Sequence, residues 1–553
     1  PSEAFYHFLP LSVTVVLEQV LDIPGLPEHV RSILTDLGTS PDLEDALLDP
    51  PRLLYRTTLD RLEGYFEGKI KKLMLDLLPE QQQYVDMENV PMFLLKGVAG
   101  CGKTTIGIYR AIRLAEQGRR VLMLTFSNTL TEVTKSLIEE LIGPLPTNLN
   151  VRTIHSLMME IMRKRHVPLN ISDKAGEYLQ EAIREVRMRN KAGVLNQGDG
   201  FFQEEIRRVI KGLGLELLDA YKVIKRYGRK TALGPVQREA IWDVYQTYQQ
   251  KLAQAMVNDW ADVALLTWKS LKQQPLEDPY DDVIVDEAQD LSPIDYRVFQ
   301  FFVPAVNPPQ KSSSILILGD AAQTLYARGF SWEQAGIQAR GRTAILRKNH
   351  RNTREIGEAA VCLLKHNEVL HSSDGFIDPE WIQRQGTLPK LIKAANGGYL
   401  ARNRLDQIAL VRDRVLDLVN LRAFRLSDFA LLCPNNEFCK MCQRELVEAG
   451  IPAVLRDAPD FKILEEQVKV LTIHSAKGLE FPVVFLMGLV EGELPNMYRL
   501  DTLEAEEKQL EIEKQRILCY VGMTRAAEEL FLVTVQGKES RFLRELEGKI
   551  AVN

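Results

Sequence analysis

The chain has 553 residues, 45% of them apolar and 26% charged, and a formal net charge of −6, which together predict a globular protein of several domains. The mild acidity excludes a histone-like protein that binds by bulk charge, although a cleft lined locally with donors can still hold phosphates. No run of 18 apolar residues occurs, so no membrane span is expected, and the six scattered cysteines are typical of a cytoplasmic protein.

The first segment, residues 1–76, is expected to be a helical N-terminal extension. Between Leu59 and Leu77, leucine, phenylalanine and isoleucine recur at steps of three and four residues, as on the apolar face of an amphipathic helix. Such a segment can pack on the main body as a cap or bind a partner protein, and both alternatives stay open.

From Pro91 onward, short apolar runs alternate with helical stretches, which is the pattern of an α/β fold with buried parallel strands. The runs lie at 92–95, 121–124, 283–285, 315–318, 429–432, 468–471, 483–486 and 530–533. They predict two parallel-sheet units in tandem. The first unit covers 77–155 and 257–340 and is interrupted by a helical insertion at 156–256, and the second covers 341–553.

A phosphate-binding loop follows the first of these runs. The segment from Gly97 to Thr104 fits the pattern G-x-x-x-x-G-K-[ST] and stands between a strand and a helical stretch, as that motif requires. Gly97, Gly100 and Gly102 let backbone N–H groups turn onto the phosphates of ATP, and the helix N-terminus adds a favourable dipole. Lys103 is expected to reach the β- and γ-phosphates, and the Thr104 hydroxyl to bind Mg²⁺.

Two adjacent acids follow the run at 283–285. Asp286 is expected to complete the Mg²⁺ site, and Glu287 to act as the general base toward the attacking water. Acids at a strand end are often merely solvated, but together with the phosphate loop this pair predicts ATP hydrolysis.

The segment Asp286-Glu287-Ala288-Gln289-Asp290 resembles the signature of the UvrD/Rep branch of superfamily 1 helicases. Further motifs similar to those of that family follow its order between about Leu77 and Val533. They are Leu78 to Gln82, Thr125 to Asn128, Thr153 to Ser156, Gly319 to Tyr326, Asn349 to Thr353, Thr472 to Phe481 and Tyr520 to Ala526. The resemblance implies two tandem RecA-like motor cores that hydrolyse ATP while moving along single-stranded DNA in the 3′-to-5′ direction, with a place in DNA repair.

The resemblance also implies roles around the nucleotide. Gln81 would read adenine, Glu480 would contact the ribose, and Gln323 would couple the γ-phosphate to the bound strand. Arg351 and Arg525 would reach the γ-phosphate from the second core, so that closure of the cleft and hydrolysis depend on each other.

Eight residues of the motifs are expected at the nucleic acid, because single-strand binding needs phosphate donors and flat rings for the bases. The expected phosphate contacts are Thr125, Thr153, His155, Thr472 and His474, the expected stacking platforms are Phe126 and Tyr326, and Asn128 is expected to contact the nucleic acid as well. Such contacts do not depend on a 2′-hydroxyl, so an RNA-directed motor stays open as an alternative. A regulatory ATPase that acts with a partner protein through the N-terminal helices also stays open.

Several departures from the family pattern limit what can be carried over. Thr105 and His350 replace the arginine and the tyrosine that stack on adenine, which predicts looser selectivity for ATP. Ala327 replaces the tryptophan usual after Tyr326. The segment 451–470 lacks the large insertion typical of the second core, so the expectation is translocation, with duplex separation left open.

Overall fold

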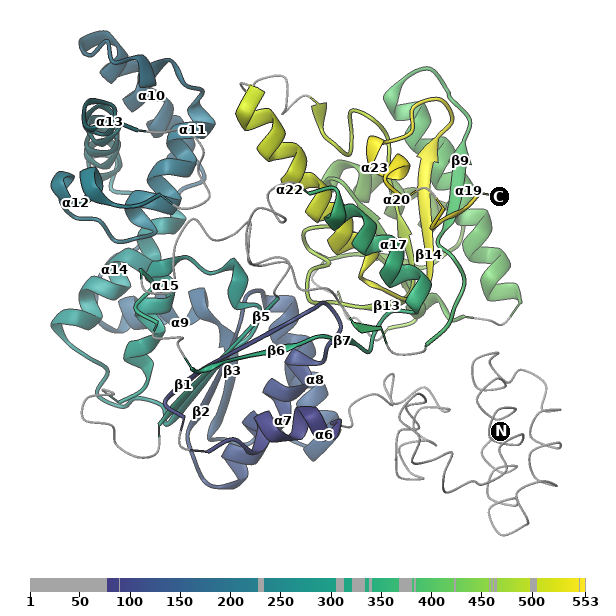
Figure 1. Cartoon of the computed structure of the whole chain (residues 1–553), viewed down its shortest axis with the longest axis horizontal. Helices are drawn as coiled ribbons and strands as arrows, with labels where there is room; N and C mark the ends of the chain where they lie inside the picture. Colours follow the sequence, from purple (N-terminus) through teal and green to yellow (C-terminus); the bar gives the residue numbers. More distant parts are fainter. Residues whose placement is uncertain are drawn as a thin grey trace.

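The structure is a computed structural model. It describes residues 77–553 except 89, 227–232, 305–312, 321–333, 338–340, 368–379, 382–383, 422–423, 457, 459–460, 462–464, 498–504, 547 and 553. The expected N-terminal extension and the segment from Gln323 through Tyr326 and Ala327 therefore lie outside the described residues. Figure 1 shows two sheet-based cores side by side, with a helical lobe above the first.

The first core is a six-stranded parallel sheet in the order β3-β2-β4-β5-β1-β6. Its strands are β1 (Met92–Gly97), β2 (Val121–Thr125), β3 (Leu149–Thr153), β4 (Asp282–Val285), β5 (Ser314–Asp320) and β6 (Thr343–Leu346). Alternate residues of each strand enter different apolar clusters: Val121 and Met123 pack on one face, Leu122 and Leu124 on the other. Both faces are therefore buried, which is why these strands read as continuous apolar runs.

Helices cover the two faces of the first sheet unequally. One face packs against α6 (Pro79–Asp86), α7 (Lys103–Glu116) and α8 (Asn128–Ile142). The other shares one apolar core with the helical insertion. The helices on this side are α9 (Ile154–Lys164), α10 (Ala175–Arg189), α11 (Asp199–Glu204), the π-helix η2 (Glu205–Lys211), α12 (Leu218–Val223) and α13 (Pro235–Gln254), followed after the insertion by α14 (Trp260–Gln273) and α15 (Pro293–Phe299). None of the helices in the described part of the chain is long and apolar enough to cross a bilayer.

The second core is a seven-stranded parallel sheet in the order β11-β12-β10-β13-β14-β9-β15. Its strands are β9 (Lys390–Ala394), β10 (Phe429–Cys433), β11 (Ala453–Leu455), β12 (Val468–Thr472), β13 (Phe481–Leu486), β14 (Ala526–Val535) and β15 (Ala551–Val552). Helices α17 (Arg354–Lys365) and α22 (Ala505–Met523) cover one face, and α19 (Leu400–Asn420) and α20 (Asn436–Glu448) the other. The two parallel-sheet cores predicted from the sequence, with a helical insertion in the first, are confirmed.

The crossing between the cores corrects the boundary expected at residue 341. Residues 343–346 form the edge strand β6 of the first sheet, in register with β1, so that Leu346 lies beside Gly97. Val98 N–H donates to Leu346 O at 3.1 Å, and His350 N–H donates to Gly100 O at 2.9 Å. The chain therefore stays bound to the first core as far as His350, because these backbone groups complete the hydrogen bonding of the phosphate loop.

Candidate nucleotide and single-strand site

The phosphate loop joins the end of β1 to the start of α7. Gly100 and Gly102 have φ angles of +72° and +84°, a left-handed conformation that glycine adopts without strain. A Cβ on Gly102 would lie 2.4 Å from the Gln81 side-chain nitrogen, so the loop also needs glycine for space. Lys103 Nζ donates to the carbonyls of Gly97 at 3.2 Å and Val98 at 2.8 Å, which holds the ammonium over the loop.

Thr104 and Asp286 form the site expected for Mg²⁺. Thr104 Oγ1 donates to Asp286 Oδ2 at 2.7 Å. Burial and the neighbouring Glu287 raise the pKa of Asp286 to about 6. A hydroxyl and one carboxylate, completed by substrate phosphates, are ligands of the kind that Mg²⁺ uses in nucleotide sites, so these residues fit the ion.

Glu287 follows β4 in a left-handed backbone conformation, with φ of +52° and ψ of +36°. A non-glycine residue there costs on the order of 1–3 kcal/mol and is a feature of functional sites. Gln289 donates its side-chain amide to the Glu287 carboxylate. Burial acts against ionisation, but Lys477, Lys103 and Arg525 outweigh it and hold the pKa of Glu287 below its ordinary value. An ionised carboxylate in this position can accept a proton from water.

The two expected arginine fingers lie close to each other and to Glu287. Arg525 is 3% exposed and donates to the carbonyls of Val521 at 3.0 Å and Leu479 at 3.2 Å. Burial and the charge of Arg525 lower the pKa of Arg351 to about 10. Arg351 Nε lies 2.5 Å from Glu480 Oε2, so the glutamate expected at the ribose is here the ion-pair partner of a finger.

The expected adenine side of the site is formed by α6, the start of α7 and residues after β6. Gln81 is buried and its side-chain nitrogen donates to Cys101 O at 3.1 Å. His350 is also buried, with Nε2 at 3.7 Å from Glu80, and its Nδ1 has no hydrogen-bond partner among the described residues. Burial lowers the pKa of His350. Thr105 lies in the first turn of α7 and is half-buried.

The residues expected at the single strand divide into exposed groups and groups that shape turns. Phe126, between β2 and α8, is 41% exposed. Thr125, by contrast, is 3% exposed, and its hydroxyl lies 2.6 Å from that of Thr131. Asn128 begins α8, so Phe126 and Asn128 are presented by a turn that Thr125 helps to hold.

Thr153 and Thr472 end β3 and β12, at equivalent places in the two cores. The hydroxyl of Thr153 accepts from Ser156 N–H at 3.1 Å, and that of Thr472 accepts from Ser475 N–H at 3.2 Å. Each threonine therefore closes a turn that carries a histidine, namely the half-buried His155 and the exposed His474.

Trp260 is a surface aromatic that the motifs did not single out. It begins α14, is 58% exposed, and meets the His155 ring edge-on at 6.1 Å between ring centroids. The only sequence signal was an aromatic residue directly after the helix-capping Asp259. Its neighbour His155 places it on the same surface as the expected strand contacts.

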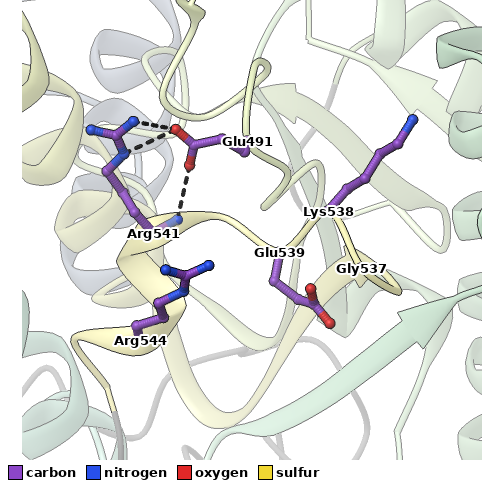
Figure 2. Close-up of a pocket in the computed structure, with 6 residues that line it drawn as sticks. All are labelled: Glu491, Gly537, Lys538, Glu539, Arg541 and Arg544. Atoms are coloured by element: carbon purple, nitrogen blue, oxygen red, sulfur yellow. Dashed lines mark hydrogen bonds and ion pairs between the residues drawn. The ribbon is translucent and has the colours of Figure 1, made fainter.

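A separate cavity of about 500 Å³ lies outside these motifs (Figure 2), beyond the carboxyl end of β14. Lysine, arginine and glutamate side chains line it together, and Arg541 Nε donates to Glu491 at 2.9 Å. Because acids and bases alternate there, the cavity does not present a uniform surface for phosphates.

Comparisons with known proteins give a consistent assignment. Residues 77–339 match the UvrD/REP helicase N-terminal domain, and residues 456–537 match the UvrD-like helicase C-terminal domain. The ATP-dependent DNA helicase PcrA of Leuconostoc citreum is 22% identical over 68% of this chain, which spans 49% of that protein. A probable DNA helicase II homolog of Rickettsia felis is 22% identical, with 86% of this chain and 96% of that protein covered.

The ATP-dependent DNA helicase PcrA of Bacillus subtilis is 20% identical, with 87% of each chain covered. The alignment runs over 674 positions, more than the 553 residues of this chain. The Bacillus protein therefore carries residues inside the aligned region that have no counterpart here.

Proposed function

The chain belongs to the UvrD/Rep helicase family, and from that membership we propose that it is an ATP-driven motor that moves along single-stranded DNA in the 3′-to-5′ direction. The polarity rests on the family resemblance of the motifs. ATP and Mg²⁺ are its proposed cofactors.

The proposal is supported by opposite charges that the two cores bring close to each other. The Glu287 carboxylate comes from the first core, whereas Lys477 and Arg525, which lower its pKa, come from the second. A triphosphate bound on the loop at Lys103 adds negative charge at this junction and attracts the same cations. Binding of the substrate and closure of the cleft thus favour each other.

Each group then has a distinct chemical task. Lys103 holds the phosphates, and Glu287 accepts the proton of the attacking water. Arg351 and Arg525 stabilise the charge that develops on the transferred group, which is typically worth about 10³–10⁵ in rate for such a finger. Thr104 and Asp286 would hold Mg²⁺, which would neutralise charge on the phosphate oxygens.

A strand-displacement assay on 3′-tailed, 5′-tailed and blunt duplexes, with ATP turnover measured in parallel, tests the proposal. We expect single-stranded DNA to stimulate turnover, and any displacement to require the 3′ tail. Stimulation by RNA alone would favour the RNA-directed motor. Turnover that neither nucleic acid stimulates would contradict a motor and favour a regulatory ATPase that acts with a partner protein.

One observation favours translocation over duplex separation. Only residues 456–467 lie between β11 and β12, the place where the family's large insertion is expected. We therefore expect the protein to displace streptavidin from the 5′ end of a biotinylated single strand, but not from the 3′ end, even where it separates duplex poorly. Displacement from the 3′ end alone would show the opposite polarity.

A further inference from the structure

The second core contacts two consecutive residues, Thr129 and Leu130, of the strand-binding segment of the first core, which we define as residues 126–130. Arg456 Nε donates to Thr129 Oγ1 at 3.1 Å, a contact between residues 327 positions apart in the chain. The next residue, Leu130, leaves the first core and packs into the apolar cluster of the second, which includes Ala476 and Leu479. Both contacts are made by the first turn of α8.

Gly478 leaves the space in the second core that the Leu130 side chain occupies. Its φ of +80° suits glycine, and a Cβ there would lie 2.5 Å from Leu130 Cδ2. The leucine side chain therefore occupies the space that any side chain at residue 478 would need. Leu130 is 8% exposed, so this contact between the cores is well packed.

The same turn of the second core also faces the nucleotide site. Lys477, directly before Gly478, is the first of the cations whose charge acts on Glu287. One dipeptide thus joins the proposed catalytic acid to the segment that presents Phe126. Lys477 and Gly478 are consecutive, so movement of Lys477 toward or away from Glu287 must also move Gly478, against which Leu130 packs.

We propose that Arg456 is a positioning residue that latches the strand-binding segment at 126–130 to the second core, so that closure of the cleft repositions Phe126 on the strand. The inference rests on the proposed motor function. Arg456 begins the short connection between β11 and β12, so in this chain that connection itself reaches across the cleft. The residue acts through Thr129.

The test compares Arg456→Ala, Arg456→Lys, Thr129→Val and the Arg456→Ala/Thr129→Val double variant with the wild type. Arg444→Ala is the matched control, because Arg444 lies on α20 of the same core, is 59% exposed and pairs with glutamates of its own helix. Basal ATP turnover, turnover with saturating oligo-dT, and oligo-dT affinity with and without a non-hydrolysable ATP analogue are measured for each.

We expect Arg456→Ala to reduce the stimulation by oligo-dT, and the effect of the analogue on oligo-dT affinity, by about tenfold, the size of one charge-assisted hydrogen bond. Basal turnover and its KM for ATP should stay within about twofold. Thr129→Val should reduce the response to oligo-dT similarly, the double variant should add little to either single change, and Arg456→Lys should restore part of the response.

The remaining outcomes distinguish failure of the Arg456 contact from failure of the proposed motor function. Normal stimulation and nucleotide response in Arg456→Ala, with a stimulated wild type, would overturn the latch and leave the motor intact. Loss of basal turnover together with stimulation would show a merely structural role and also overturn the latch. A wild type that no nucleic acid stimulates would overturn both.

Discussion

At the scale of single residues, Lys103 and Glu287 belong to one core but carry opposite charges, so their replacement tests different steps. Lys103→Ala should weaken nucleotide binding, because the ammonium over the loop is lost. Glu287→Gln should leave binding intact and reduce turnover by about 10²–10⁴, the usual contribution of a general base. Titration with a fluorescent ATP analogue and phosphate release separate the two effects. Wild-type turnover in Glu287→Gln would exclude it as the base.

The adenine side of the site gives a second residue-scale prediction. Threonine at 105 offers no ring or guanidinium face, and His350 is a small, buried imidazole. Because a cationic or aromatic face contributes about 0.5–2 kcal/mol, we expect measurable turnover of GTP. Thr105→Arg should tighten ATP binding with little change in kcat, because the contact is equal in ground and transition states. A wild type strictly selective for ATP, with kinetics unchanged by Thr105→Arg, would contradict this.

At the scale of elements, the exposed aromatic residues of the first core predict a strand-binding surface. Phe126→Ala and Trp260→Ala should each weaken oligo-dT binding by about 1–3 kcal/mol, the cost of one lost base stack. Basal ATP turnover should survive in both variants. Tyr399→Ala is the control, because Tyr399 is 66% exposed at the start of α19 in the other core. Equal binding by all three variants and the wild type would place both rings outside the strand path.

The helical insertion is held by a buried ion cluster. Lys211, at the end of η2, is fully buried and lies 2.7 Å from both Asp259 and Asp262. Lys211→Met should lower the stability of the insertion by about 3–5 kcal/mol, because the buried Asp262 and the half-buried Asp259 lose their cation. Lys164→Met, which removes an exposed pair with Glu160, should cost less than about 1 kcal/mol. Urea unfolding followed by tryptophan fluorescence measures both, and equal midpoints would contradict the buried cluster's role.

The elements that the sequence predicts are those whose signal is local. All eight expected strands occur, because each is a run buried on both faces. The strands of the two sheets that the sequence did not predict are β3, β6, β9, β11 and β15, which are two to five residues long, and β6 is identified only by its pairing with β1. The phosphate loop is likewise a contiguous motif. The Arg456–Thr129 contact and the pairing of Arg351 with Glu480 join distant residues, so no local pattern could predict them.

At the scale of the whole molecule, the two arginines proposed as fingers, Arg351 and Arg525, are anchored differently. Arg351 directly follows His350, whose N–H donates to the phosphate loop. Arg351 itself lies against that loop, because a Cβ added to Gly100 would lie 2.6 Å from the Cβ of Arg351. Among the described residues, Arg525 is held by two carbonyls and by the Thr524 hydroxyl, all of the second core. The first finger should therefore stay near the phosphates, whereas the second should approach them only on closure.

Their replacement should separate binding from closure. Arg525→Ala should cut oligo-dT-stimulated turnover by about 10³ or more with little change in ADP affinity. Arg351→Ala should reduce turnover similarly and, in addition, weaken ATP binding in the absence of DNA. Equilibrium titrations with ADP and an ATP analogue, beside steady-state kinetics, measure these effects. Collapse of ADP binding in Arg525→Ala, with turnover per bound ATP unchanged, would exclude a finger role.

The crossing of the chain beside the phosphate loop also sets the mechanics of a step. If the cores rotate about that crossing, β1 lies at the pivot and β2, which leads to Phe126, lies three strand spacings away in the sheet. At about 4.8 Å per spacing, this is a lever arm of about 14 Å. An advance of about 3.4 Å, one nucleotide of a stacked strand, would then need a rotation of roughly 14°. A motor whose pivot lies at the nucleotide-binding site can thus take single-nucleotide steps with only a small opening around the phosphates.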